Sequence, residues 1–338
     1  MKTRHFVHLL WVPALLALVA CSETSPAPEP AEAPAEPQLV EEPATDTSTD
    51  PRQSVLYAPG LFCDEDTSEA QLQALQGAGF TTINLFALRI GENGDLRTCN
   101  RPAVDVDGNI DPGINPKLGE YVDKLRAQGV QAVVQTIGAG GPPTPVDYIR
   151  AQKLLSTSEG TTTLTKTLQA WATFARIDGF DFDDEEPGPE EGGQVEPATI
   201  ASLAAIVAPM GKQNIVTAAP YGTPSETFWL EALAKIEADN GSQLMTWWNL
   251  QIYGGADASS WITTMKNYSE PIGISDIDNF FVAGYSATDS DPGSVCTDIQ
   301  ALDVGGGMIW NMGLIESGSS SFADYSSNIR SGLAKTCS

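Results

Sequence analysis

The sequence predicts an α/β fold, a single (β/α)8 barrel over residues 54–338. Three observations support this prediction. Eight short apolar runs typical of buried strands alternate with eight helical patterns. Strict alternation of strand and helix requires a parallel sheet with right-handed crossovers. The stretch also has the length of one closed barrel; a doubly wound open sheet is the alternative.

The first 20 residues have the pattern of an export signal. Lys2 and Arg4 precede the apolar run "FVHLLWVPALLALVA", which is too short to cross a membrane and ends in small residues. The junction "LVAC" resembles the lipobox of bacterial lipoproteins, which implies cleavage before Cys21 and lipidation of its sulfur. We therefore expect residues 1–20 to be a lipoprotein signal peptide, with an ordinary secretory signal as the alternative. The protein would be an exported lipoprotein at the outer membrane or cell surface.

Residues 21–53 form the expected linker between the lipidated cysteine and the barrel. They are rich in Pro, Ala, Glu and Thr and nearly free of large apolar side chains, so they cannot bury a core. The formal net charge of the whole chain is −26, which disfavours nucleic acid and anionic lipid as partners. We expect a neutral ligand, a membrane contact through the lipid anchor only, and a monomer.

The eight strand-helix units follow one another from residue 54 to the end of the chain. Each strand is a short apolar or alternating run bounded by turn residues. The expected strands are 54–60, 80–88, 130–138, 179–185, 214–220, 244–253, 279–285 and 306–310. Several helical patterns begin at Ser or Thr and end at Gly, as helix capping favours. The expected helices are 68–79, 117–129, 162–176, 197–211, 225–241, 258–268, 294–302 and 321–334.

The cysteines and histidines limit the chemistry that the chain can perform. Four cysteines besides Cys21 remain in a chain expected to leave the cytoplasm, which indicates two disulfides. We favour Cys63 with Cys99 and Cys296 with Cys337, because each pair joins neighbouring strand-helix units. No CxxC spacing occurs, so we expect no metal site. Both histidines lie in the expected signal peptide, which excludes Ser-His-Asp and Cys-His catalysis in the mature chain.

The fourth expected strand, "GFDFDDE", carries an unusual series of acids. Alternation along a strand places Asp181, Asp183 and Glu185 on one face, while the intervening phenylalanines pack under the helices. Three carboxylates that point into a barrel repel one another, which raises at least one pKa. Glu185, nearest the mouth of the barrel, could then stay protonated and act as a general acid. A solvated turn would not need the phenylalanines, and a calcium site favours a flexible loop.

This strand, with the preceding aspartate, resembles the DGxDxDxE signature of glycoside hydrolase family 18, which includes chitinases and endo-β-N-acetylglucosaminidases. The matching residues are Asp178, Gly179, Asp181, Asp183 and Glu185. Three other strands agree in order. "QTIG" at 135–138 resembles the third-strand SxGG, "NLQIYGG" at 249–255 the sixth-strand QxYN or MxYD, and "GGGMIW" at 305–310 the eighth strand. The resemblance spans most of residues 55–335 and implies the same (β/α)8 fold.

The resemblance implies a substrate-assisted mechanism, in which the 2-acetamido oxygen of the sugar attacks the anomeric carbon. Glu185 would protonate the glycosidic oxygen and then activate water. Asp183 would hold the acetamide N–H, and Asp181 would hydrogen-bond Asp183. Tyr253 would donate a hydrogen bond to the acetamide oxygen, and Trp310 would form the floor under the −1 sugar. No metal and no organic cofactor is implied.

Four further residues are candidates for contact with the substrate. Gly254 stands where the family often has Asp or Asn, so Asn249 or Gln251 would supply the missing polar contact. Trp248 is a candidate for stacking on a sugar at the rim, with buried packing as the alternative. Tyr57, near the end of the first expected strand, completes the set.

The expected partner is a polysaccharide or glycan that contains N-acetylglucosamine. We expect chitinase-type hydrolysis of chitin or chito-oligosaccharides with retention, because "WWNLQIY" resembles plant- and fungal-type chitinases. One alternative is an endo-β-N-acetylglucosaminidase that cuts the N-glycan core, since "DFDDE" with Asp184 looks more like endoglycosidases of the endoglycosidase H type. A non-catalytic glycan-binding lectin and a cell-wall hydrolase acting on peptidoglycan are further alternatives.

Overall fold

The computed structural model describes residues 50, 52, 54–138, 146–184, 194–221, 226–240, 243–253, 258–269, 272–274 and 276–337. The compact unit that contains them spans Ser48–Ser338. The expected signal peptide (1–20), Cys21 and the linker up to residue 49 lie outside the described residues. The boundaries of these N-terminal segments therefore stay a prediction.

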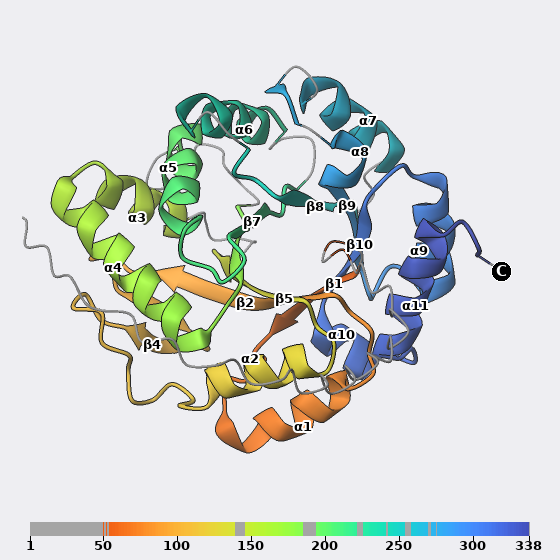
Figure 1. The fold of residues 1–338 in the computed structure, drawn as a ribbon, viewed down its shortest axis with the longest axis horizontal. Coiled ribbons are helices and arrows are strands. Elements are labelled where there is room, and N and C mark those ends of the chain that lie inside the picture. The colour runs from red at the N-terminus through yellow and green to blue at the C-terminus, as the bar shows by residue number, and fades with distance from the viewer. Residues whose placement is uncertain are drawn as a thin grey trace, which may run out of the picture. The chain divides into compact units, whose positions relative to one another are not determined.

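Eight parallel strands form a closed barrel. They are β1 (Ser54–Pro59), β2 (Thr82–Ile90), β5 (Ala132–Ile137), β6 (Gly179–Phe182), β7 (Ile215–Ala218), β8 (Trp247–Gln251), β9 (Phe281–Ser286) and β10 (Gly306–Trp310). Each strand pairs with the next along the chain, and β1 pairs with both β2 and β10, which closes the ring. In Figure 1 the helices surround the strands, and β10 lies beside β1. The predicted (β/α)8 barrel is confirmed, and the open sheet is wrong.

Helices of the barrel cover the outer face of the strands. They are α1 (Glu65–Leu75), α2 (Leu118–Ala127), α3 (Val146–Leu155), α4 (Ser158–Ala175), α5 (Pro197–Val207), α6 (Glu226–Asn240), α7 (Ala258–Ser269), α8 (Ile277–Phe280), α9 (Pro292–Ala301), α10 (Met312–Ser317) and α11 (Phe322–Leu333). Local sequence explains several starts. The side chains of Thr157 and Asp291 cap α4 and α9, and Ser321 and Asp324 form a capping box at α11.

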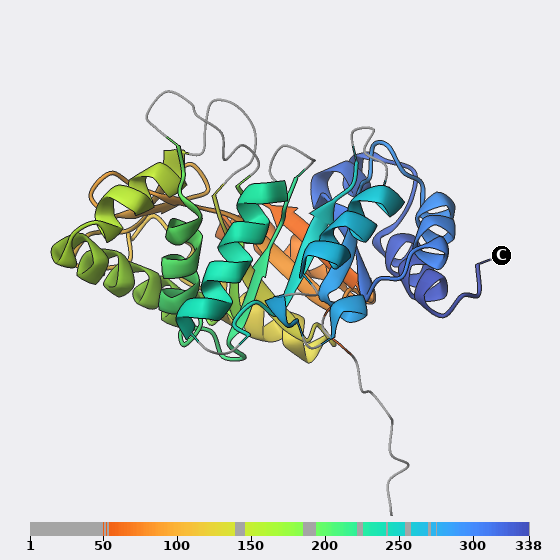
Figure 2. The same cartoon turned by 90° about the horizontal axis from the view of Figure 1, so that it is seen from above.

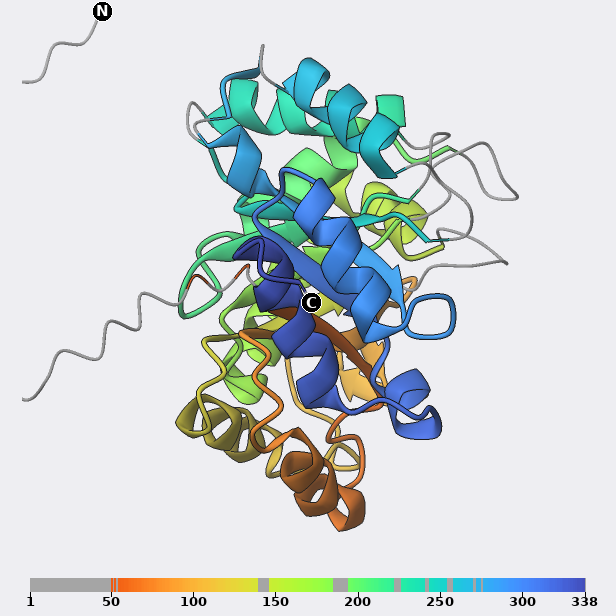
Figure 3. The same ribbon diagram turned by 90° about the vertical axis from the view of Figure 1, so that its right-hand side faces the viewer.

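Every expected helix is present, but three short helices were not predicted. The unpredicted helices are α3, α8 and α10. Figure 2 places α3 and α4 on one side of the barrel and α9 and α11 on the opposite side. Figure 3 shows α9 and α11 side by side in front of β10. None of the helices within the described ranges is both long enough and apolar enough to span a membrane.

Two apolar clusters divide the core into layers. The outer cluster lies between the strands and the helices and includes Phe180, Phe182 and Trp248. The inner cluster fills the barrel and includes Tyr57, Trp247 and other side chains from alternate strand positions. Because side chains alternate along a strand, each strand contributes to both layers.

An antiparallel extension follows β2 and was not predicted. β3 (Leu96–Thr98) pairs with the end of β2, and β4 (Arg101–Val104) pairs with β3. Their short length and charged residues, Arg97 and Arg101, leave no period-2 apolar signal. The extension lies at the carboxyl end of β2, which is the end of the barrel where ligands of this fold bind.

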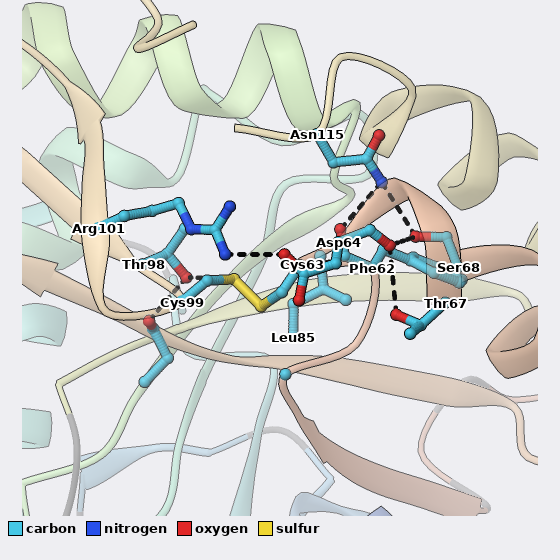
Figure 4. The surroundings of a disulfide bond; sticks show 12 residues. Phe62, Cys63, Asp64, Thr67, Ser68, Leu85, Thr98, Cys99, Arg101 and Asn115 are labelled. Atoms are coloured by element: carbon cyan, nitrogen blue, oxygen red, sulfur yellow. Dashed lines mark hydrogen bonds and ion pairs between the residues drawn. A yellow bond between two sulfur atoms is a disulfide. The ribbon is translucent and has the colours of Figure 1, made fainter. Parts of the chain in front are cut away.

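Both predicted disulfides are confirmed. Cys63 pairs with Cys99, and Cys296 pairs with Cys337. Figure 4 shows that the first bond joins the loop after β1 to the turn between β3 and β4. Two polar contacts reinforce this junction: Arg101 donates to the Asp64 carboxylate at 2.8 Å, and the Asn115 amide donates to the Phe62 carbonyl at 3.1 Å.

Candidate active site

Asp181 on β6 and Asp183, directly after this strand, both lie at the barrel interior. Asp181 is 0% exposed and Asp183 is 4% exposed. Phe180 and Phe182 point the other way, into the outer apolar layer. The alternation predicted for this strand is therefore confirmed. Glu185 lies outside the described residues, so its assignment as the general acid stays a prediction.

Asp181 accepts four hydrogen bonds in the middle of the barrel. Its strand neighbours Thr136 and Thr217, in register with it on β5 and β7, donate from their hydroxyls at 3.0 and 2.6 Å. The Tyr57 hydroxyl donates at 2.8 Å and the Asn249 amide at 3.3 Å. Burial raises the pKa of Asp181, and these four hydrogen bonds oppose that rise.

Asp183 is held from β8. The Gln251 amide donates from Nε2 to Oδ1 of Asp183 at 3.0 Å and to the Ala219 carbonyl at 2.9 Å. Its Oε1 accepts a hydrogen bond from the Tyr253 hydroxyl. A chain of hydrogen bonds thus runs from a half-buried tyrosine at the mouth to the Asp183 carboxylate.

Gly138 lets the loop after β5 approach the acids closely. Its φ of +87° favours glycine, and a Cβ there would lie 2.6 Å from the Asp183 carbonyl and 2.8 Å from the Tyr148 ring. Tyr148 in turn donates to the Ile137 carbonyl at 2.6 Å. Burial and the nearby Asp184, Asp183 and Asp181 raise the pKa of Tyr148 well above its usual range, so it is a neutral donor.

Aromatic rings line the interior above Asp181. The half-buried Trp310 packs edge-on against Phe86 with ring centroids 4.8 Å apart, and it lies 5.9 Å from Tyr57. Across the mouth, the ring of Tyr253 lies 6.3 Å from that of Tyr221. An apolar ring beside polar groups is the arrangement that a sugar needs, since a sugar has apolar faces and polar edges.

Asp178 has a different task from the other acids of the motif. It lies just before β6, at the amino ends of the strands, opposite the mouth. Its carboxylate accepts hydrogen bonds from Arg126 at 2.7 Å and from the backbone N–H of Val133 at 2.8 Å. These contacts stabilise the junction of β5, β6 and α2, so Asp178 is a structural residue.

Three predicted roles need correction. Trp248 does not face the interior; it is fully buried against Trp229 and Phe280 under the helices, because it lies one residue out of register with the inward positions. Asn249 and Tyr57 are also buried, and they contact Asp181, so they are not placed to touch a substrate directly.

A direct hydrogen bond between Asp181 and Asp183 was also expected. Within the part of the chain that the structure describes, no such bond exists, because both oxygens of Asp181 are already occupied by the four donors. Asp183 instead turns its Oδ1 to Gln251.

Sequence reasoning missed four residues that contribute to the site. Phe86 packs against Trp310, Tyr221 approaches Tyr253, and Thr136 and Thr217 donate to Asp181. The two threonines could have been found, because they occupy inward positions of strands on either side of Asp181. Among the described residues, no group of three or more His, Cys, Asp or Glu side chains is arranged to hold a metal ion.

Comparison with known proteins rests on the fold. No family model and no curated protein matches the chain by sequence. Many solved structures match it in three dimensions. A GH18 chitinase from Cycas revoluta, in a complex with allosamidin, superposes with a TM-score of 0.59 at 13% identity, covering 83% of this chain and 99% of the other. The fold is that of the GH18 chitinases.

Other neighbours agree on this fold. The GH18 chitinase ChiB from the chitin utilization locus of Flavobacterium johnsoniae has a TM-score of 0.56 at 11% identity, covering 82% of this chain and 94% of the other. The catalytic domain of a family GH18 chitinase from the fern Peteris ryukyuensis has a TM-score of 0.54 at 17% identity, covering 82% and 98%. At these identities the similarity shows the fold alone. The activity has to be argued from the residues of the site.

Proposed function

We propose that the chain hydrolyses β-1,4 glycosidic bonds next to N-acetylglucosamine, as a retaining, substrate-assisted chitinase. The observation that carries this proposal is the placement of Asp183. Its carboxylate lies at the barrel interior and is linked through Gln251 to the Tyr253 hydroxyl, while Asp181 beneath it is fixed by four donors. An amide group of a substrate needs both an acceptor for its N–H and a donor for its oxygen, and Asp183 and Tyr253 supply them.

The proposed reaction proceeds in two steps. Glu185 donates a proton to the glycosidic oxygen while the acetamide oxygen attacks the anomeric carbon, so the bond to the leaving sugar breaks and an oxazolinium ion forms. Asp183 accepts the acetamide N–H and offsets the positive charge of that ion. Water then attacks the anomeric carbon, Glu185 takes its proton, and the acetamide is released. Two inversions at one carbon give net retention.

Two residues would position the reacting sugar. The Tyr253 hydroxyl would turn from Gln251 to the acetamide oxygen and hold it below the anomeric carbon. Trp310, supported by Phe86, would form the apolar floor under the sugar ring. No metal or organic cofactor takes part in this scheme.

The proposal extends to where the protein works. We propose that Cys21 is lipidated and that the barrel is tethered as a monomer at the outer membrane or cell surface, with 1–20 removed and 21–53 as linker. Just before β1, Arg52 donates to the Asn279 carbonyl at 2.9 Å, at the amino ends of the strands. The chain thus enters the barrel at the end opposite the mouth.

A product analysis tests the proposed function. The purified chain is incubated with chitohexaose and, separately, with a high-mannose glycopeptide, beside the Glu185→Gln variant, and products are identified by mass spectrometry. Shorter chito-oligosaccharides that the variant fails to produce are the expected result. A peptide that keeps one N-acetylglucosamine would instead indicate an endo-β-N-acetylglucosaminidase, and binding without cleavage would indicate a lectin. Activity on purified wall sacculi alone would favour a peptidoglycan hydrolase.

A further inference from the structure

A buried chain of hydrogen bonds leads from β8 to Asp181. The Trp247 indole Nε1 donates to Oδ1 of Asn249 at 3.0 Å. The Asn249 Nδ2 donates to the Tyr57 hydroxyl at 3.1 Å and to Oδ1 of Asp181 at 3.3 Å. Trp247, Asn249 and Asp181 are 0% exposed and Tyr57 is 1% exposed, so water does not compete for these groups. Trp247 is the only member that does not itself contact Asp181, among the contacts within the described residues.

The orientation of the Asn249 amide decides how it acts on Asp181. The oxygen and nitrogen ends of a carboxamide have nearly the same shape, but one accepts and the other donates. Packing alone therefore cannot fix which end faces Asp181. An indole N–H can only donate, so Trp247 requires the oxygen of Asn249 on its side. The donor end is left for Asp181 and Tyr57.

A reversed amide would cost Asp181 two of its four donors. The oxygen of Asn249 would then face an Asp181 oxygen, where the two acceptors repel each other. It would also face the Tyr57 hydroxyl, whose single proton now goes to Asp181 at 2.8 Å. Tyr57 could give that proton to Asn249 instead. Only the hydroxyls of Thr136 and Thr217 would remain fixed on Asp181.

We propose that Trp247 is a positioning residue that sets the orientation of the Asn249 amide and thereby keeps both Asn249 and Tyr57 donating to Asp181 beneath the reacting sugar. The effect of Trp247 on the orientation of the Asn249 amide does not depend on which reaction the protein catalyses. Its effect on catalysis rests on the proposed function, in which Asp183 offsets the positive charge of the intermediate and the buried Asp181 lies directly beneath Asp183.

Only neutral groups among the described residues donate hydrogen bonds to Asp181. Among the described residues, the titratable groups near Asp181 are Tyr57 on β1, Tyr148 on α3, and Asp183, two residues further along the chain. In the described ranges no lysine or arginine contacts Asp181. Burial together with Asp181 and Asp183 raises the pKa of Tyr57 well above its usual range, so Tyr57 stays a donor. Because no described cation contacts Asp181, we expect the loss of hydrogen-bond donors to raise its pKa further.

The first test compares two tryptophans that follow each other on β8. Trp247→Phe removes the indole N–H from the inner layer. Trp248→Phe is the matched control, because Trp248 is equally buried and its Nε1 has no partner among the described residues. We expect the acid limb of the kcat/KM profile to move to higher pH in Trp247→Phe, with roughly a tenfold loss on that limb, because Asp181 loses hydrogen-bond donors that favour its ionised form. Trp248→Phe should keep the wild-type profile.

A second readout does not depend on activity. Asp181 is followed by the 13C signal of its carboxyl group during a pH titration of aspartate-labelled protein, with Asp181→Asn to assign the signal. We expect Asp181 to titrate at higher pH in Trp247→Phe than in the wild type and in Trp248→Phe. An unchanged titration of Asp181 would overturn the proposal. If the wild type cleaves neither test substrate, the proposed function fails, while this titration still decides the role of Trp247.

A further variant keeps the experiment decisive if Trp247→Phe does not fold. Benzothienylalanine has nearly the shape of tryptophan but carries sulfur in place of the N–H. Placed at position 247, it should reproduce the shift of the Asp181 titration with little loss of packing. A wild-type titration in this variant would show that the indole N–H does not orient Asn249.

Discussion

Asp181 shows how hydrogen bonds oppose the effect of burial on a carboxyl group inside the barrel. Burial disfavours the ionised form, and the four donated hydrogen bonds favour it. All four donors are neutral and come from β1, β5, β7 and β8. The carboxylate therefore joins β6 to these four strands, so a change there affects both the stability of the barrel and the electrostatics of the site.

The Asp181→Asn variant tests the importance of this carboxylate, because asparagine has nearly the same shape as aspartate but carries an amide. The new amide nitrogen would face hydroxyls that now donate, so at least one of them would lose its acceptor. We expect the free energy of unfolding to fall by about 1–3 kcal/mol and hydrolysis to fall by about a hundredfold. Thermal unfolding and initial rates on chitohexaose measure the two effects. Asp66→Asn, at an exposed acid of α1, is the control and should change neither.

At the scale of elements, the sequence contains most of the barrel. Buried parallel strands are continuous apolar runs, so all eight were predictable, and their alternation with helices fixed the topology. The elements that were missed have no such signal. β3 and β4 are short and partly charged. Only two residues separate the end of α3 from the start of α4, where one helix per strand was expected.

The site was predictable where residues share a strand face. Counting back from Gln251 in steps of two gives Asn249 and Trp247, so the outward direction of Trp248 was already contained in the alternation. The partners of Asp181 were not predictable in the same way. They lie on four strands, and their levels depend on the register between strands, which the sequence does not contain.

Substitutions at the two glycines that flank β5 distinguish the cost of backbone strain from the cost of close packing. Gly138 has a φ of +87° and close neighbours at its Cβ position, whereas Gly129 has a φ of +100° and nothing within 4 Å. Gly129→Ala should cost about 1–2 kcal/mol of unfolding free energy, from the left-handed backbone alone. Gly138→Ala should cost more and also lower kcat, because the new methyl group would push on the Asp183 backbone. Equal losses of stability with unchanged kcat would refute this distinction.

The two disulfides allow a similar comparison. Their cysteines are 36 and 41 residues apart, so removing either should cost a similar amount, about 2–4 kcal/mol. Cys63 and Cys99 line a small cavity together with Phe86, which supports Trp310. We expect the double Cys→Ser variant at 63 and 99 to raise KM for chito-oligosaccharides, while the variant at 296 and 337 keeps it. Unfolding curves and steady-state kinetics measure both, and an equal rise in KM would contradict the link to Phe86.

For the whole molecule, charge is the dominant feature. The sequence has 44 acidic and 18 basic residues, so the folded chain repels itself at neutral pH. A chain of this charge should be stabilised by salt, because ions screen exposed charges beyond about 10 Å at 0.1 M. The same charge keeps polyanions away while leaving a neutral glycan free to approach.

The pH dependence of stability follows from two opposing sets of carboxylates. Burial raises the pKa of Asp181 and Asp147, so the folded state binds their protons more tightly than the unfolded state. Their contribution to stability is complete below the usual aspartate pKa of about 4 and is lost as the pH rises through the folded value. The pKa of Asp123 is lowered, mainly by Arg176 and Lys212 against the effect of burial, so its contribution is lost as the pH falls below about 4.

We therefore expect the thermal midpoint to be highest at mildly acidic pH and to fall toward pH 8, where self-repulsion adds to the loss from the buried acids. Raising NaCl from roughly 10 mM to 0.3 M should increase the midpoint at pH 8 and change it little at pH 5, because screening acts on the repulsion between exposed charges. Calorimetric scans between pH 3 and 9 at both salt concentrations measure this. A midpoint that rises steadily to pH 9, or that salt lowers at pH 8, would mean that specific ion pairs outweigh both the buried acids and the net charge.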